Sequence, residues 1–170
     1  MSNTSNIIGD PGENLAALRL AKYGVFKIYF LGEKAPSADF LIEIIDADKP
    51  YHALVQVKSI GQEIRYRSTG WMITPVPKQK LSALHKRVLP TYVAGVDLIE
   101  ERVYIAPAFI SSAEDMKLTS GTPPVLILSN DETSAKAALT QLKNDMIRYW
   151  EDNSVPQHKE TYTSLLRLSH

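Results

Sequence analysis

One short run constrains the fold of this chain most, because apolar and polar residues alternate along it: Ala53-Leu54-Val55-Gln56-Val57-Lys58-Ser59. This alternation is typical of a strand that buries one face. Successive side chains of a strand point to opposite faces, so Val55 and Val57 should face a core. Gln56 and Lys58 should then project together from the other face, and the run predicts a strand with a carboxamide and an ammonium group side by side.

A second predicted strand spans residues 38–45, with Asp39 near its start, and residues 46–51 between the two strands have the composition of a turn. If the hairpin turns at the midpoint of that stretch, Asp39 lies opposite Lys58 and is a diagonal neighbour of Gln56, about 7–8 Å away. A register slip of two residues keeps the three side chains on one face, whereas a slip of one does not. The hairpin therefore predicts a place for a divalent metal ion and a phosphate group.

The order of these residues resembles the PD-(D/E)XK nuclease superfamily. The likeness is an Asp, a gap of 16 residues and Gln-X-Lys on the next strand, and the Gln variant is similar to Mrr-type restriction endonucleases. The wider layout is similar to small standalone proteins of the DUF4365 type, over about residues 9–109. The matching features are Gly12-Glu13 on an early helix, Asp39, Val55 to Lys58, Trp71, the Lys-rich stretch Lys78 to Arg87, and the strand Pro90 to Asp97. Two positions depart from the superfamily pattern, since Ala38 stands where Pro is usual and Gln56 where an acid is usual.

The resemblance implies an α/β fold with a restriction-endonuclease-like core, in which helices flank a central mixed β-sheet in a single domain. It also implies a metal-dependent endonuclease that hydrolyses DNA phosphodiester bonds, in defence or DNA repair. Asp39 would be the principal ligand of Mg²⁺ or Mn²⁺ and Glu13 the second, because these ions prefer oxygen ligands. Gln56 would supply its side-chain oxygen or orient a water. Lys58 would orient the attacking water or stabilise developing negative charge.

Each of these assignments has a structural alternative. Glu13 falls three residues after Asp10 and two after Pro11, which is the pattern of a helix capping box. Without the resemblance, Asp39 and Lys58 are better explained by an exposed cross-strand ion pair, which contributes less than about 1 kcal/mol. At the level of the whole protein, the alternative is a non-catalytic nucleic-acid-binding or interaction module that keeps the fold.

The charge distribution favours DNA as the partner. The whole chain has a formal net charge of zero, with 19 basic and 19 acidic residues. Residues 56–90 hold seven Lys or Arg and one Glu, a net charge of +6. A concentrated basic segment beside the candidate site suits contacts with a phosphate backbone. We expect Arg65, Arg67, Lys78 and Lys80 to make these contacts; the alternative is a solvated loop and helix face.

Length and composition bound the remaining possibilities. A chain of 170 residues fits one domain, which we place at residues 9–152, between a disordered stretch at 1–8 and an extension at 153–170. The absence of Cys excludes disulfides, zinc–thiolate sites and a Cys nucleophile. No apolar run is long enough to span a membrane and no signal peptide is recognisable, so we expect a cytoplasmic protein without membrane partners. A homodimer remains one oligomeric state open to it.

The other expected elements follow from periodicity and turn residues. The first helix, opening at Asp10-Pro11 and ending at Gly24, should bury Leu15 and Leu18. The remaining expected elements are a strand at 25–31, a small hairpin of 64–67 with 71–73, a helix at 77–89, a hairpin of 91–98 with 102–107, a polar loop at 111–122, a strand at 124–128, a helix at 134–151 and a short helix within 158–170. We expect Trp71 to be core and Asp97, at a strand end, to be structural.

Overall fold

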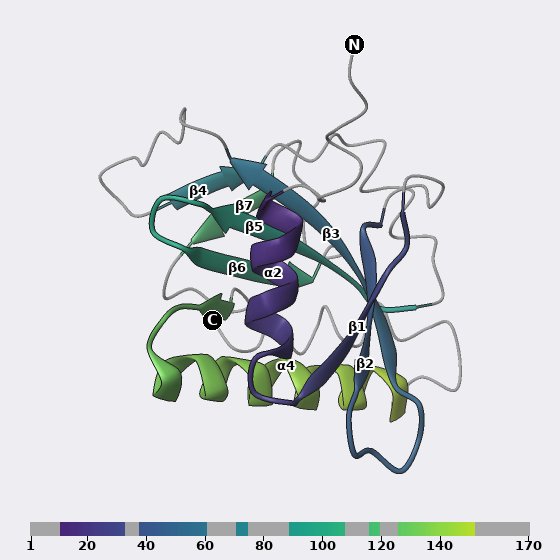
Figure 1. Cartoon of the computed structure of the whole chain (residues 1–170). Helices are drawn as coiled ribbons and strands as arrows, with labels where there is room; N and C mark the ends of the chain where they lie inside the picture. Colours follow the sequence, from purple (N-terminus) through teal and green to yellow (C-terminus); the bar gives the residue numbers. More distant parts are fainter. Residues whose placement is uncertain are drawn as a thin grey trace.

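The computed structural model describes residues 11–32, 38–60, 71–74, 89–107, 116–119 and 126–151. Two helices and eight strands lie within these ranges (Figure 1). In chain order they are α2 (Pro11–Ala21), β1 (Phe26–Phe30), β2 (Phe40–Ile44), β3 (His52–Ile60), β4 (Trp71–Thr74), β5 (Thr91–Asp97), β6 (Arg102–Pro107), β7 (Met116–Thr119), β8 (Leu126–Leu128) and α4 (Glu132–Glu151). None of these helices is both long enough and apolar enough to span a membrane.

Six of the strands form one mixed sheet in the order β1-β2-β3-β5-β6-β8, and β4 pairs with β7 in a separate ribbon. Strands β3 and β5 run parallel, with Gln56 beside Val93 and Lys58 beside Gly95, while the other pairs are antiparallel. The chain is thus a single-domain α/β protein with a central mixed sheet flanked by two helices, and the predicted fold class is confirmed. The predicted hairpin of 91–98 with 102–107 is also confirmed.

The main core lies between the two helices and one face of the sheet. The strand residues on this face include Val55 and Val57, which are 0% and 7% exposed, and Phe40, Ile42 and Ile44 of β2 also belong to the core. Helix α4 contributes buried residues at helical spacing: Ala135, Leu139, Leu142, Met146 and Tyr149. These positions confirm the face that alternation predicted for β3, and α4 confirms the helix predicted at 134–151.

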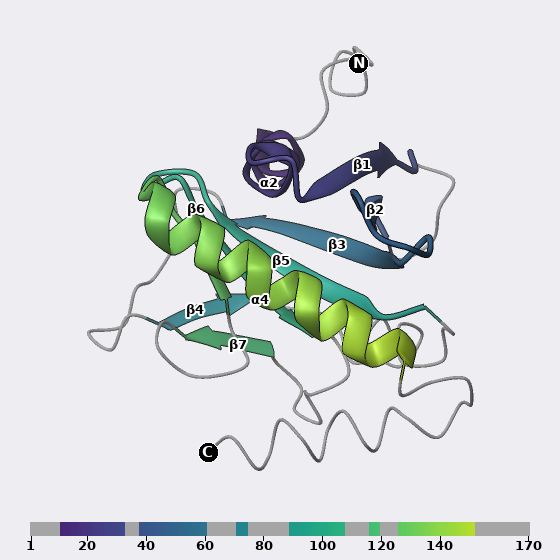
Figure 2. The same ribbon diagram turned by 90° about the horizontal axis from the view of Figure 1, so that it is seen from below.

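The second face of the sheet is buried as well, where the sequence predicted a polar face open to solvent. Leu54 and Gln56 of β3 are 4% and 7% exposed, and Val93 and Tyr104 on the neighbouring strands are also buried. The ribbon of β4 and β7 lies on the opposite side of the sheet from α2 (Figure 2). A central strand in parallel pairing is commonly covered on both faces, which explains why Gln56 is buried.

The register of the β2–β3 hairpin differs by two residues from the prediction. Phe40 pairs with Val55 and Glu43 with His52, so Asp39 lies beside Gln56 and not opposite Lys58. The turn comes earlier than the midpoint of residues 46–51, because Asp46 adopts a left-handed conformation with φ of 57°. Asp tolerates this conformation better than most residues, although its sequence does not demand it. A shift of two residues leaves every side chain on its predicted face.

One further expectation is wrong, and another lies outside the described residues. The strand that starts at Trp71 pairs with β7, at Met116–Thr119, where the sequence predicted a polar loop. Its expected partner at 64–67 lies outside the described residues, as do the helix at 77–89, the tail at 158–170 and the N-terminal stretch at 1–8. A pairing between segments so distant in the sequence has no local signal, whereas a hairpin around Ser-Thr-Gly has one.

Helix α2 buries a line of residues that was not predicted; of the two residues expected to be buried, Leu15 packs against the core and Leu18 does not. Leu18 is 58% exposed, whereas Ala16 and Leu20 are fully buried. Gly12, Ala16 and Leu20 follow one another at four-residue spacing, so they lie along one line of the helix. A Cβ on Gly12 would lie 2.4 Å from the Ser59 Cβ, which no real contact allows. The helix therefore packs against β3 through its glycine, and this contact selects the buried line.

A buried arginine, for which no role was predicted, connects α2 to the β5–β6 turn and to the segment that precedes α4. Arg19 is 6% exposed, and its Nε and Nη2 atoms donate to the Glu101 carbonyl oxygen at 3.3 and 3.0 Å. Its Nη2 atom also donates to Asn130 Oδ1 and lies 3.7 Å from Glu101 Oε2. Glu101 lies in the β5–β6 turn and Asn130 lies two residues before α4, so one guanidinium group joins three segments.

The close approach of Gly12 gives a test of this helix orientation. We expect Gly12→Ala to lower the free energy of unfolding by about 1–3 kcal/mol, the usual cost of overpacking a core. Leu18→Ala, on the exposed side of the same helix, should change it by less than about 0.5 kcal/mol. Urea denaturation of the two variants measures both values. A larger loss for Leu18→Ala than for Gly12→Ala would contradict the packing described.

Candidate functional site

The candidate site lies at the point where β2 and β3 separate. Phe40 and Val55 form the last pair of their ladder, and β3 then continues to Ile60 with β5 as its partner. Figure 1 shows the β1–β2 hairpin leaving the sheet at this end. We call this place the fork, defined by Asp39 on one side and residues 56–59 of β3 on the other. Backbone groups of β3 beyond the fork need partners other than β2.

Asp39 supplies one of these partners with its side chain. Its Oδ2 atom accepts a hydrogen bond from the Val57 backbone N–H at 2.5 Å. Its own backbone N–H donates to the Val55 carbonyl at 2.9 Å, and its carbonyl accepts from the Leu31 N–H at 3.0 Å. Asp39 is therefore held by β1 and β3 through its backbone and by β3 through its carboxylate.

Gln56 meets Asp39 directly. Its Nε2 atom donates to Asp39 Oδ2 at 2.5 Å and to the Val57 carbonyl at 3.3 Å. A carboxylate only accepts hydrogen bonds, so the amide nitrogen has to face Asp39, and Oε1 is the atom with which the amide can accept. The predicted proximity of Asp39 and Gln56 is thus a direct contact.

Lys58 shares the strand face of Gln56, since the two are separated by one residue of β3. It is half-buried, one pleat closer to the end of the strand. Asp39 and Gln56 are joined by their side chains, so the side chains of Asp39, Gln56 and Lys58 share one face of the sheet at the fork, as strand parity predicted.

Glu13 lies at the start of α2, which packs on the end of β3. It lies in the first turn of α2, directly after the glycine that packs on Ser59. The partial positive charge of a helix N-terminus favours a carboxylate at this position. Asp10, the cap in the alternative interpretation, lies outside the described residues. Glu13 is half-buried and neighbours the segment of β3 that carries Lys58.

The oxygen donors of the fork fit a hard divalent cation. Asp39, Glu13 and Gln56 offer two carboxylates and one carboxamide oxygen, the donor types that Mg²⁺ prefers. Within the described ranges, no three His, Cys, Asp or Glu side chains come together as a metal-binding group. A metal ion at the fork would thus have few protein ligands, and water or a phosphate group would complete its coordination.

The other polar clusters of the described residues have evident structural roles. Glu43 accepts a hydrogen bond from the Tyr29 hydroxyl at 2.9 Å and lies 3.3 Å from His52 Nε2. The Tyr29 hydrogen bond, with a smaller contribution from His52, lowers the pKa of Glu43. Asp97 Oδ1 accepts from the backbone N–H groups of Ile99 and Glu100 at 2.9 and 3.0 Å. Asp97 thus shapes the β5–β6 turn, in line with the structural role predicted for it.

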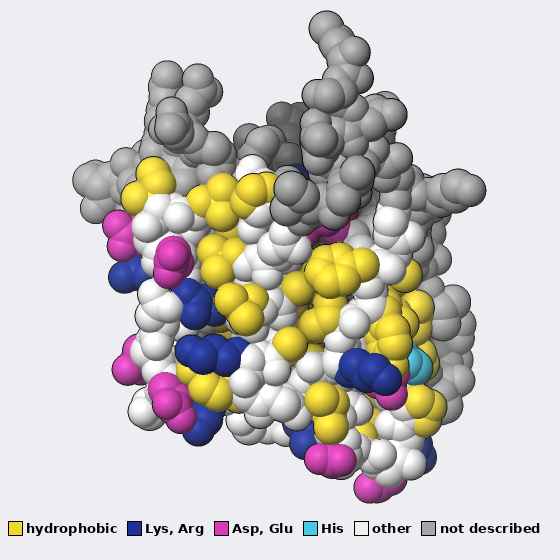
Figure 3. All heavy atoms as spheres, viewed as in Figure 1, with side chains coloured by type: hydrophobic (Ala, Val, Ile, Leu, Met, Phe, Trp, Pro, Cys, Tyr) yellow, Lys and Arg dark blue, Asp and Glu magenta, His cyan; other side chains and the backbone are white. Residues whose placement is uncertain are grey.

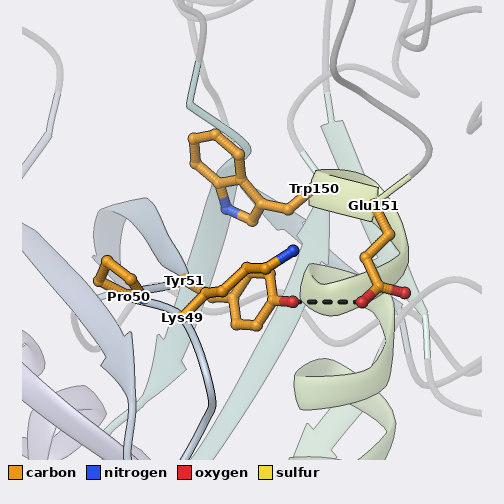
Figure 4. A pocket seen from close by; sticks show the side chains of 5 residues that line it. All are labelled: Lys49, Pro50, Tyr51, Trp150 and Glu151. Carbon is orange, nitrogen blue, oxygen red and sulfur yellow. Dashed lines mark hydrogen bonds between the residues drawn. The ribbon is translucent and has the colours of Figure 1, made fainter.

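A surface cavity of about 490 Å³ lies at the other end of the β2–β3 ladder from the fork. It is lined by Lys49, Pro50, Tyr51, Trp150 and Glu151 (Figure 4). The Tyr51 hydroxyl donates to Glu151 Oε1 at 3.2 Å, and Trp150 Nε1 donates to the His52 carbonyl at 2.9 Å. These bonds attach the end of α4 to the hairpin turn, so we interpret the cavity as a packing feature and not as the site of chemistry.

The predicted DNA-contacting residues, Arg65, Arg67, Lys78 and Lys80, lie outside the described residues. On the face in Figure 3, the described Lys and Arg side chains are interspersed with acidic and hydrophobic ones. The basic segment at 56–90 therefore stays a prediction from the sequence.

Two contacts at the fork were not predicted: the bond from the Val57 N–H to Asp39, and the packing of Gly12 on Ser59. The Val57 N–H is a backbone group, so no residue type signals its bond to Asp39. Gly12 did leave a signal, because a glycine inside the first turn of a helix is unfavourable unless another segment approaches closely.

Comparison with known proteins supports the fold. No family model matches the sequence, and no curated protein matches it. The structure is similar to that of a bacterial homing endonuclease, with a TM-score of 0.53 and 18% sequence identity. The similarity covers 90% of this chain and 100% of the other. The chain thus has a fold found in an endonuclease, and at this identity the likeness concerns the fold alone.

Replacement of Asp39 distinguishes the fork from an exposed ion pair. Asp39→Ala removes the acceptor of the Val57 N–H and one of the two acceptors of the buried Gln56 amide, so we expect it to lower the free energy of unfolding by about 2–4 kcal/mol. Asp39→Asn should cost about 1 kcal/mol, because its side-chain oxygen can take the place of Oδ2 and accept from both Val57 and Gln56. Chemical denaturation measures both, with Asp48→Ala in the exposed turn of the same hairpin as the control. A loss below about 1 kcal/mol for Asp39→Ala would favour the ion pair.

Proposed function

We propose that this protein is a metal-dependent endonuclease that hydrolyses DNA phosphodiester bonds. The observation that carries the proposal is the contact between Asp39 and Gln56 at the fork, with Lys58 on the same side of β3. Asp, Gln and Lys stand there in the order of the PD-(D/E)XK superfamily, on a sheet whose fold resembles that of a homing endonuclease. A setting in defence or DNA repair follows from the resemblance alone.

Asp39 and Glu13 would hold a Mg²⁺ or Mn²⁺ ion, together with the side-chain oxygen of Gln56. When bound, the ion offsets negative charge on the phosphate and lowers the pKa of water. Asp39 is suited to the principal place, because Val57 and Gln56 fix the orientation of its carboxylate. Preorganised ligands need no rearrangement when the substrate arrives.

Lys58 would act on the reacting groups. Its ammonium group can donate to the attacking water or to a phosphoryl oxygen on which charge develops. Its position, one pleat beyond Gln56, puts it on the face of the sheet on which the Asp39 and Gln56 side chains meet. The basic residues at 65, 67, 78 and 80 would bind the DNA backbone on either side of the scissile phosphate.

A second candidate function is DNA binding without cleavage. The observation that favours it is Gln56, which brings no charge to a site where the superfamily usually has an acid. With two carboxylates, the site would bind a divalent ion more weakly than a site with three. Retention of Glu13, Asp39 and Lys58 together is the reason for preferring the enzyme.

Cleavage assays on Asp39→Asn and Lys58→Ala separate the two functions. In the enzyme, Asp39→Asn should abolish plasmid nicking in Mg²⁺ or Mn²⁺, because the principal charged ligand is lost while the fold survives. Lys58→Ala should lower the rate by about 10²-fold or more, the typical effect of removing one transition-state donor. Both should retain most of their DNA affinity in EDTA.

The control for these assays is wild-type protein in EDTA, which should not nick plasmid. Nicking that persists undiminished in Asp39→Asn would indicate a contaminating nuclease and remove the support for catalysis. Absence of nicking in all proteins, with DNA affinity intact, would favour the binding module.

The basic segment predicts salt-dependent binding. We expect charge reversal at Arg65, Arg67, Lys78 and Lys80 to weaken DNA binding and to reduce the slope of log affinity against log salt by about one unit for each phosphate that is no longer bound. Fluorescence anisotropy with labelled duplex DNA across a salt series measures both. Charge reversal at Lys136 and Lys143 of α4 is the control. An affinity independent of salt, or of these four residues, would refute their assignment.

A further inference from the structure

We propose that Gln56 is a positioning residue, whose side-chain amide holds the Asp39 carboxylate in place before any metal ion binds. This role differs from that of a metal ligand, and an acid at the same position would not perform it. The positioning role rests on contacts within the chain; only its consequence for metal binding rests on the proposed function.

The geometry of the fork supports this role. The Gln56 Nε2 atom lies between two acceptors, Asp39 Oδ2 at 2.5 Å and the Val57 carbonyl at 3.3 Å. The Val57 N–H donates to the same Asp39 Oδ2 atom at 2.5 Å. Two donors therefore converge on one oxygen of the carboxylate and fix its plane, so the direction of the other oxygen, Oδ1, is set as well. The amide itself is fixed, because Gln56 is 7% exposed.

The charge of the group at position 56 decides whether the fork can form without a cation. A neutral amide attracts the carboxylate by donating a hydrogen bond to it. A carboxylate in the same place would offer no proton, and two negative groups at 2.5 Å would repel each other in a partly dry environment. An acid at position 56 would thus destabilise the contact with Asp39 unless a cation lay between the two groups, whereas Gln56 stabilises this contact by itself.

An acid in place of Gln56 would have opposite effects on the order of the fork and on the affinity for a metal ion. With Gln56 the fork is ordered in the metal-free protein, but the site carries one negative charge fewer. With an acid, metal affinity rises while the metal-free fork loses its hydrogen bond and gains a repulsion. Gln56 thus lowers the metal affinity of the site, but it keeps the Asp39 carboxylate in position before DNA binds.

Three variants test the proposal. Gln56→Glu exchanges the amide for an acid of nearly the same shape, and Gln56→Met removes the hydrogen bond without adding charge. Gln141→Glu is the matched control, because Gln141 on α4 also donates its Nε2 to a carboxylate, Asp145 Oδ1 at 2.8 Å, away from the fork. Each protein is compared in EDTA and in millimolar Mg²⁺ by thermal unfolding and by amide hydrogen exchange at Val57.

In EDTA we expect the unfolding midpoint of Gln56→Glu to fall by about 3–8 °C relative to wild type, for the lost bond and the added repulsion. Its Val57 amide should exchange faster by on the order of tenfold or more, since the acceptor of that N–H is no longer held. Mg²⁺ should restore both properties in Gln56→Glu, with an affinity on the order of tenfold tighter than in wild type. Gln56→Met should show a smaller loss that Mg²⁺ does not restore, and Gln141→Glu should leave Val57 protected.

The proposal is overturned if Gln56→Glu in EDTA is as stable as wild type with Val57 still protected, or if Gln56→Met and Gln56→Glu lose the same stability and respond identically to Mg²⁺. Failure of the proposed function would look different. Loss of Val57 protection in Gln56→Glu without nicking by any variant would keep the positioning role and remove the enzyme. Nicking by wild type with no change at Val57 would keep the enzyme and remove the positioning role.

Discussion

The carboxylate of Asp39 replaces a missing strand. Up to the pair of Phe40 and Val55, the backbone of β2 forms hydrogen bonds with the backbone of β3. Beyond this pair, the Asp39 side chain accepts a hydrogen bond from the Val57 N–H. Because a buried backbone donor without a partner is costly, this one bond allows β2 to leave the sheet while β3 continues beside β5. The fork depends on that bond, and Asp39, Gln56 and Lys58 all lie at the fork.

Two contacts on the helix side hold the fork from the other direction. Gly12 lets the start of α2 lie directly on Ser59, and Arg19, near the end of the same helix, bonds to the β5–β6 turn and to Asn130. A buried guanidinium group keeps a favourable free energy only when its donors are satisfied, so Arg19 allows little sliding of α2. The position of Glu13 therefore depends on a glycine one residue before it and on an arginine six residues after it.

The sequence predicted which face of a strand each residue occupies, but it did not predict the register of β2 with β3 or the pairing of strands that are distant in the chain. Alternation placed Val55 and Val57 in the core, and parity put Asp39, Gln56 and Lys58 together, because a strand has a period of two whatever its register. The register itself depended on the left-handed conformation of Asp46, which the sequence permits but does not require. Leu18 was misassigned for a related reason, since the apolar stripe of α2 is ambiguous and the Gly12 contact decides between its faces. The pairing of Trp71–Thr74 with Met116–Thr119 joins distant segments, for which propensity gives no signal.

The fork also explains why burial and chemistry occur together at Gln56. A residue on a strand covered on both faces is shielded from water, so its polar atoms have to find partners within the protein. Asp39 and the Val57 carbonyl are such partners, and they lie there because the pairing of β2 with β3 ends at the residue before Gln56. In this setting a neutral amide stabilises the fork without a metal ion, whereas an acid would destabilise it. The substitution that departs from the superfamily pattern is thus consistent with the geometry around it, and the identity of residue 56 follows from the same bond that lets the strands separate.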